Sequence, residues 1–185
     1  MAFGVILWVI LIILGIIILW FVFTYNRFIV LRNRIENAFS QIDVQLKRRY
    51  DLIPNLIESV KGYMKHEKTV LTEITKARSS LISGDIHKKA QASNQITEAL
   101  KTIFAVAENY PKLQASQNFL QLQEELSGTE SKIAYSRQFY NDSVLAFNQK
   151  AQSLPSNILA NIFNFDEKEY FEVPETERKA VKVKF

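Results

Sequence analysis

The chain has 185 residues and a formal net charge of +4, and 48% of its residues are hydrophobic. It has no cysteine, which excludes a disulfide framework and any chemistry that depends on a thiolate. Glycine and proline are scarce, at five and four residues, whereas helix-forming residues are abundant after the N-terminal region. The composition therefore favours a helical protein, with enough chain beyond its first helix for one domain with a core.

The first 23 residues carry no charged side chain. About 20 apolar residues in a helix cross the roughly 30 Å hydrocarbon core of a bilayer, and lipid forces such a run to be helical. A cleaved signal peptide fits less well, because no Lys or Arg precedes the run and bulky residues follow it. A buried core helix is also disfavoured by the length of the run. We therefore predict a transmembrane anchor over residues 1–25.

The charges beside this run predict its orientation. Basic residues follow the span and none precedes it, so the N-terminus should lie outside and residues 24–185 in the cytoplasm. Aromatic side chains at the end of the run are suited to the membrane–water interface. The predicted membrane-interface residues are Trp20, Phe23, Tyr25, Arg27, Arg32 and Arg34.

Residues 24–49 form a basic stretch, with six Lys and Arg against two acids, or 6 − 2 = +4. Such a stretch is attracted to anionic lipid head groups, so the bilayer is the expected partner. Nucleic-acid binding is the other use of this charge balance, but no recognition motif supports it. The simplest interpretation is a solvated helix face that sets the topology.

Apolar residues after the span recur at spacings of three and four, which indicates helices packing on helices. No alternation of period two is sustained enough to predict strands. The apolar positions are Leu31, Ile35, Ala38, Ile42, Leu46, Ile53, Leu56, Val60, Met64, Leu71, Ile74 and Leu81. The predicted fold class is all-α.

Predicted breaks divide this pattern into four helices, over residues 28–52, 54–83, 86–109 and 112–152. Pro54 disfavours helix at the residue before it, and Gly62 is a second weak point. Gly84 is suited to end one helix and Asp85 to cap the next, and Pro111 suits a first helical position. Short connections favour an antiparallel up-and-down bundle, which we place over residues 26–163. A single bent helix over residues 28–83 is the alternative at Pro54.

Two further segments follow the long helices. Pro155 should end the last of them, and residues 157–163 form a short amphipathic piece. Residues 164–185 have alternating charges, which favours an extended C-terminal tail.

The motifs of common catalytic sites are missing. His66 and His87 are the only histidines, and His66-Glu67 is followed by Val70 rather than by the second histidine of a zinc site. The sequence has no phosphate-binding glycine loop and no GxSxG elbow. We therefore expect no enzymatic activity, and no catalytic, cofactor-binding or metal-binding residues.

Three charged residues, Arg78, Glu130 and Arg137, fall on positions that the apolar spacing assigns to helix faces. The simpler interpretation is a partly exposed pair at the edge of the bundle. If the residues are buried, they form an interhelical polar network in which Glu130 needs a cation. Arg137 is seven residues away on the same helix, about 10 Å along its axis. Arg78, on another helix, is then the predicted partner of Glu130.

The helices also carry more large apolar side chains than a four-helix core needs. Phe119, Phe139, Tyr140 and Phe147 could extend such a surface outward. Exposed apolar patches of this kind mark contact sites, so a homo-oligomer is expected.

Several stretches together resemble a known family. They are RNRIENAFSQIDVQLKRR (residues 32–49), DLIPNL (51–56), AVAENYP (105–111), and the spaced residues Thr129, Glu130, Ile133, Arg137, Tyr140 and Asn141. The chain is similar along essentially its whole length to the LemA family of bacterial membrane proteins. The resemblance implies one N-terminal span in the bacterial plasma membrane, a cytoplasmic up-and-down helical bundle, and no established activity or cofactor.

Two functions are compatible with these observations. The first is a membrane-anchored helical scaffold or adaptor without catalytic activity, which presents a helical surface at the cytoplasmic face of the membrane. The alternative is an accessory or regulatory subunit of a membrane enzyme. The family resemblance makes a membrane zinc protease of the HtpX type a candidate partner for that role.

Overall fold

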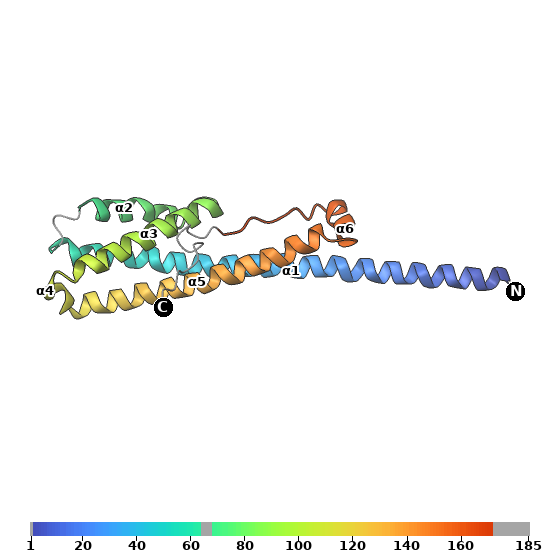
Figure 1. The fold of residues 1–185 in the computed structure, drawn as a ribbon, viewed down its shortest axis with the longest axis horizontal. Helices are drawn as coiled ribbons and strands as arrows, with labels where there is room; N and C mark the ends of the chain where they lie inside the picture. The colour runs from blue at the N-terminus through green and yellow to red at the C-terminus, as the bar shows by residue number, and fades with distance from the viewer. Residues whose placement is uncertain (1, 64–67, 172–185) are drawn as a thin grey trace, which may run out of the picture. The chain divides into compact units, whose positions relative to one another are not determined.

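A computed structural model describes residues 2–63 and 68–171 of the chain. Within these ranges every assigned element is a helix, which confirms the predicted all-α class (Figure 1). The elements are α1 (Ala2–Lys61), α2 (Lys68–Ser80), α3 (Ile86–Ala107), α4 (Pro111–Gln114), α5 (Gln117–Gln152) and α6 (Ser156–Ile162).

The chain divides into two compact units. The first, called here the anchor unit, comprises residues 1–38 and 140–170, and the second, called the inner unit, comprises residues 39–139 and 171–185. The long helices α1 and α5 each contribute one part to either unit.

The anchor unit begins with the apolar part of α1. This helix is long and apolar enough to cross a membrane by length and composition. Its first large side chains, such as Phe3 and Trp8, are 84% and 70% exposed. Residues 2–23 have a helical length of about 33 Å, which matches the roughly 30 Å hydrocarbon core of a bilayer.

A cluster of phenylalanines forms the core of the anchor unit beyond the apolar run. The ring of Phe28 on α1 stacks on Phe165 at 4.7 Å between centroids and meets Phe147 of α5 edge-on at 5.6 Å. Phe28 and Phe147 are fully buried. Offset and edge-on ring pairs are the favoured geometries, and each stabilises the contact beyond the area that it buries.

Phe165 reaches this cluster because the chain reverses after α6. Asn164 adopts a positive φ of 53°, and the Phe165 N–H donates to the Ala160 carbonyl at 2.9 Å. A left-handed residue followed by this hydrogen bond is a Schellman ending, for which Asn is the usual choice after Gly.

The chain after Asn164 is then held against α5. Asn148 donates to the Lys168 carbonyl at 2.9 Å and accepts from the Lys168 N–H at 2.8 Å. The Tyr140 hydroxyl donates to the Glu169 carbonyl at 2.9 Å. Residues 165–171 are non-helical. The rest of the predicted tail, residues 172–185, lies outside the described residues.

The inner unit packs the end of α1 with α2, α3, α4 and the beginning of α5. Ser59 near the end of α1 lies beside Asn118 near the start of α5, and Arg48, earlier on α1, pairs with Glu125, later on α5. These two helices therefore run in opposite directions. The predicted apolar positions are buried along α1, α2 and the turn after α2, except that Leu71 is half-buried and Met64 lies outside the described residues. The three-and-four spacing therefore located the apolar faces correctly.

Local signals at α3 and α4 were also correct. Gly84 has a φ of +107°, and the Asp85 side chain accepts from the Lys88 N–H at 2.9 Å as the N-cap of α3. This backbone hydrogen bond lowers the pKa of Asp85. Pro111 stands at the start of α4. Each signal acts through its own backbone geometry, which explains why the sequence alone was sufficient.

Three predicted boundaries were wrong. Pro54 does not divide α1, which continues to Lys61 and ends before Gly62. The alternative of one helix over residues 28–83 is wrong too, because α2 is a separate helix. The predicted helix over residues 112–152 is interrupted at residues 115–116, which separate α4 from α5.

Candidate functional site

The most unusual group in the inner unit is Arg49, an arginine whose side chain is fully buried. It lies between Leu46 and Ile53 on the apolar face of α1, so the helix directs its side chain into the core. Its Nη1 donates to the carbonyl and hydroxyl oxygens of Ser93 on α3, both at 3.3 Å, and to the Thr97 hydroxyl at 3.2 Å. A buried arginine thus connects α1 to α3.

Glu130 of α5 supplies the negative charge for this arginine. Its carboxylate accepts a hydrogen bond from Arg49 Nη2 and forms a salt bridge with it. The Thr97 hydroxyl lies 3.0 Å from each carboxylate oxygen and also 3.0 Å from the Ser93 carbonyl. Its single proton serves one of these acceptors at a time. Because the Glu130 side chain is 34% exposed, the pair is open to solvent on the carboxylate side.

Arg137 of α5 also contacts Ser93. It is 6% exposed, and its Nη2 donates to the Ser93 hydroxyl at 2.8 Å. Its guanidinium also lies 5.1 Å from the centroid of the Phe171 ring. The Ser93 hydroxyl oxygen therefore accepts from two arginines, Arg49 and Arg137.

The electrostatics of the cluster follow from burial. Desolvation, and next the nearby charge of Arg137, lower the pKa of Arg49 to about 9. The guanidinium therefore remains protonated at neutral pH and cannot act as a base. The cluster joins three helices, α1, α3 and α5, through directional hydrogen bonds.

The predicted network was thus partly misassigned. The structure brings Glu130 and Arg137 together around Ser93 and Thr97 but places Arg78 elsewhere. The predicted Arg78–Glu130 pair is wrong, because Arg49 occupies that position. Sequence reasoning missed Arg49 although a signal was present: the apolar stripe skips from Leu46 to Ile53, and Arg49 fills the gap.

Arg78 contacts a different group, the backbone carbonyl of Tyr50. Pro54 has no N–H, so the carbonyl of Tyr50 loses the donor that an ordinary residue at position 54 would provide. Arg78 Nε on α2 donates to this same carbonyl at 2.8 Å. The Arg78 guanidinium also lies 3.7 Å from the centroid of the Tyr50 ring, a cation–π contact. A side chain from α2 therefore satisfies the backbone that Pro54 leaves unpaired in α1.

Other members of the basic stretch behave as surface charges. Lys47 pairs with Asp51 at 2.6 Å and Arg48 with Glu125 at 2.8 Å, and these side chains are between 36% and 56% exposed. The interpretation as a solvated face is correct for Lys47 and Arg48 and wrong for Arg49.

The predicted membrane-interface residues all lie in the anchor unit. Trp20 and Tyr25 are half-buried, and Tyr25 packs against Phe163 at 4.9 Å between ring centroids. Phe23 is 71% exposed. Arg27, Arg32 and Arg34 are also exposed. Their place at the surface of a bilayer stays a prediction.

The predicted self-association surface is largely wrong. Phe119, Tyr140 and Phe147 are buried within the chain, at 1%, 5% and 0% exposure. Phe139 is 36% exposed, and it alone of the four presents an open side chain. These aromatic residues therefore mostly serve the core.

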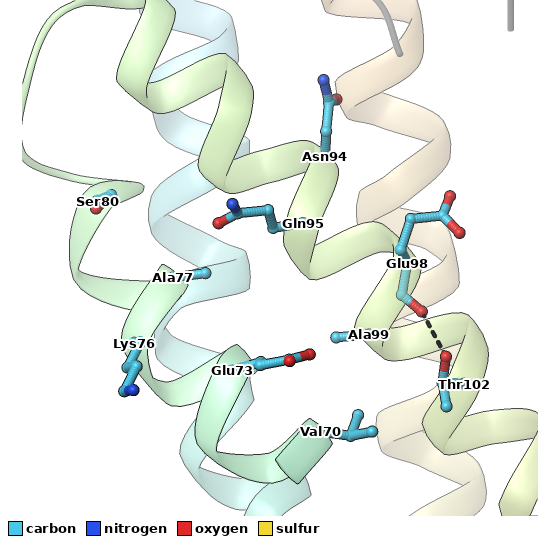
Figure 2. Close-up of a pocket in the computed structure, with 10 residues that line it drawn as sticks. All are labelled: Val70, Glu73, Lys76, Ala77, Ser80, Asn94, Gln95, Glu98, Ala99 and Thr102. Carbon is cyan, nitrogen blue, oxygen red and sulfur yellow. Dashed lines mark hydrogen bonds between the residues drawn. The ribbon is translucent and has the colours of Figure 1, made fainter. Parts of the chain in front are cut away.

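A groove of the inner unit, with a volume of about 790 Å³, lies between α2 and α3 (Figure 2). Ala77 and Ala99 contribute small buried side chains to it, and Glu73 reaches across from α2 toward α3. Among the described residues no group of three or more His, Cys, Asp or Glu could hold a metal ion. His66-Glu67, the pair rejected as a zinc site because Val70 follows it, lies outside those residues.

Comparison with known proteins agrees with this architecture. The model of the LemA family matches residues 38–185. Protein LemA of Metamycoplasma hominis is 31% identical over 170 residues, which cover 90% of this chain and 78% of that protein. Magnetosome protein MamQ 2 of Paramagnetospirillum magneticum is 23% identical over 175 residues. Magnetosome protein MamQ of Magnetospirillum gryphiswaldense is 22% identical over 174 residues. Both matches cover 80% of this chain and 64% of the MamQ protein. The chain is therefore a membrane-associated helical protein that belongs to the LemA family.

Proposed function

We propose that this protein is a membrane-anchored helical scaffold or adaptor without catalytic activity. The observation that carries the proposal is the contrast along α1. Its first 22 described residues include a window of 18 apolar residues of which none is buried in the structure, as an anchor requires. Its later part contributes Arg49 to a cluster whose hydrogen bonds run between helices. The polar groups of the interior are thus engaged in holding helices together.

The charges next to the apolar run support a cytoplasmic position for residues 24–185, at the plasma membrane of a bacterium. Arg27, Arg32 and Arg34 are exposed and follow the run directly. Basic residues beside a span are retained on the cytoplasmic side. The same residues can contact anionic lipid head groups.

The names of the relatives support a structural role. The MamQ proteins are named for the magnetosome, a cell structure, rather than for a reaction. A scaffold would present its helical surface to further copies of itself or to other membrane proteins, and the groove between α2 and α3 is one concave surface for such a contact. Nucleic acid has no part in this proposal.

The orientation is tested by a reporter fused after Phe185 that is active only outside the cytoplasm. The fusion should be silent, and replacing Arg27, Arg32 and Arg34 with Gln should raise its activity because the charge asymmetry is lost. The matched control replaces Lys68, Lys76 and Lys101, which lie farther along the chain, with Gln. Strong activity of the unchanged fusion would contradict the proposed topology.

The scaffold role is tested by purifying the tagged full-length chain from membranes in mild detergent after cross-linking. Mass spectrometry should recover multiple copies of this chain and no enzyme in stoichiometric amount. An unrelated single-span protein with the same tag is the control. Stoichiometric recovery of a membrane protease of the HtpX type would overturn the scaffold and favour the alternative, an accessory subunit.

A further inference from the structure

The segment from Leu154 to Phe165 lacks charge and is rich in apolar residues. It reads LPSNILANIFNF, twelve residues without a charged side chain, and it contains α6. The charged residues that border it are Lys150 before and Asp166 after.

One face of this segment is apolar and open. Leu154 is 79% exposed, Ile158 54%, Ile162 62% and Phe163 38%. Ile158 and Ile162 are four residues apart and therefore lie on one side of α6. The opposite side, with Leu159 and Ala160, is buried in the anchor unit. These four exposed residues are called here the α6 apolar face.

The contacts of the α6 apolar face with α1 put this face beside the end of the uncharged run. Phe163 contacts the rings of Phe21 and Tyr25 at 5.7 and 4.9 Å between centroids. Leu154 lines a hollow together with Trp20 and Arg27. Phe21 lies within the last three residues of the uncharged run, and that run is about as long as the hydrocarbon core is thick. The α6 apolar face therefore lies at the level where α1 leaves the hydrocarbon.

We propose that α6 is a second membrane contact, an interfacial helix whose apolar face enters the head-group and acyl boundary beside the span. Interfacial helices bury such a face by about 5–10 Å, which suits Ile158 and Ile162 of this short helix and the exposed apolar residues on either side of it. The Asn and Ser side chains of the segment are neutral, so no charge has to leave water. The span and α6 then hold the anchor unit at two points. The inference rests on the proposed anchor, since it requires α1 to lie in a bilayer.

The absence of cysteine from the chain allows a direct test. The full-length variants Ile158→Cys and Ile162→Cys are labelled with a nitroxide and reconstituted in vesicles of phosphatidylcholine and phosphatidylglycerol. Collision with lipid-soluble oxygen and with a water-soluble nickel chelate is then measured. Both labels should collide severalfold more with oxygen than with nickel, relative to Leu120→Cys. Leu120 is a matched control because it is 50% exposed and apolar but lies in the inner unit.

A label at Trp8→Cys separates failure of this inference from failure of the anchor. Lipid exposure at position 8 with water exposure at both α6 positions would overturn the interfacial helix and leave the span intact. Water exposure at all three positions would overturn both. Spin–spin broadening at positions 158 and 162 that disappears on dilution with unlabelled protein would show a second copy on this face, which also overturns the proposal.

Discussion

The anchor unit and the inner unit hold their helices together by different means. In the anchor unit the contacts between α1, α5 and the segment after α6 centre on rings: Phe28, Phe147 and Phe165 meet one another. In the inner unit the contacts among α1, α3 and α5 include two buried arginines and a carboxylate. Both units contain parts of α1 and α5, so the difference lies in the side chains that these helices contribute to each unit.

The difference shows what each kind of contact can specify. Apolar burial is strong but non-directional, so it favours contact without fixing which turn of one helix faces which turn of another. Hydrogen bonds from Arg49 are directional, and a shift of α3 by one turn would leave a buried charge without its acceptors. We infer that the buried arginines of the inner unit fix the register of its helices, in addition to its apolar core, whereas the anchor unit holds its helices mainly through apolar contacts.

The largest expected effect is in the anchor unit. Phe28→Ala should lower the free energy of unfolding by about 4 kcal/mol, because a fully buried ring is removed and leaves a cavity. Denaturant unfolding of the full chain in detergent measures the loss. Hydrogen exchange should show lost protection in residues 156–170 and retained protection in α3. Val30→Ala, at a position on the same helix that is 54% exposed, is the control. Equal loss of protection in α3 would contradict the division into two units.

The next effect is in the inner unit. Glu130→Ala should cost about 3 kcal/mol, because it leaves the buried Arg49 without its carboxylate. The matched control is Glu125→Ala, on the same helix, which removes an exposed partner of Arg48 and should cost only about 0.5 kcal/mol. The same unfolding experiment measures both variants. Similar small losses in the two would show that Arg49 does not depend on Glu130.

The smallest predicted effect concerns Pro54 and Arg78. Arg78→Ala should cost about 1–2 kcal/mol, because the Tyr50 carbonyl then loses its donor. In a Pro54→Ala background the restored N–H can serve that carbonyl, so the same change should cost about 1 kcal/mol less. A double-mutant cycle of unfolding free energies gives this coupling. Additive losses would refute the assignment of Arg78 as the substitute donor.

The sequence was sufficient wherever one residue or one periodicity determines the outcome. The apolar run of α1, the buried stripe, and the cap at Asp85 all follow from local geometry or from side-chain spacing. The LemA resemblance was confirmed by the family model over residues 38–185 and by a relative that is 31% identical. These features require no knowledge of how distant segments meet.

The sequence was insufficient where a distant residue changes a local rule. Pro54 is a helix breaker by its own chemistry, yet α1 continues through it, and the Arg78 side chain compensates from 24 positions away in the sequence. Arg49 was assigned to a solvated face together with the other basic residues of the stretch 24–49, of which Lys47 and Arg48 are surface charges in the structure. The choice of Arg49 over Arg78 as partner of Glu130 depends on which helices are adjacent, and side-chain spacing does not contain that information.

The contact of Arg78 with the Tyr50 carbonyl also constrains how this chain can evolve. A lineage that lost Arg78 first would pass through a protein with an unpaired backbone carbonyl, whereas one that lost Pro54 first would not, because the new N–H serves the carbonyl. The two positions should therefore covary among related sequences, with proline at position 54 accompanied by a donor at position 78. Sequences without that proline should accept a wider range of residues at position 78.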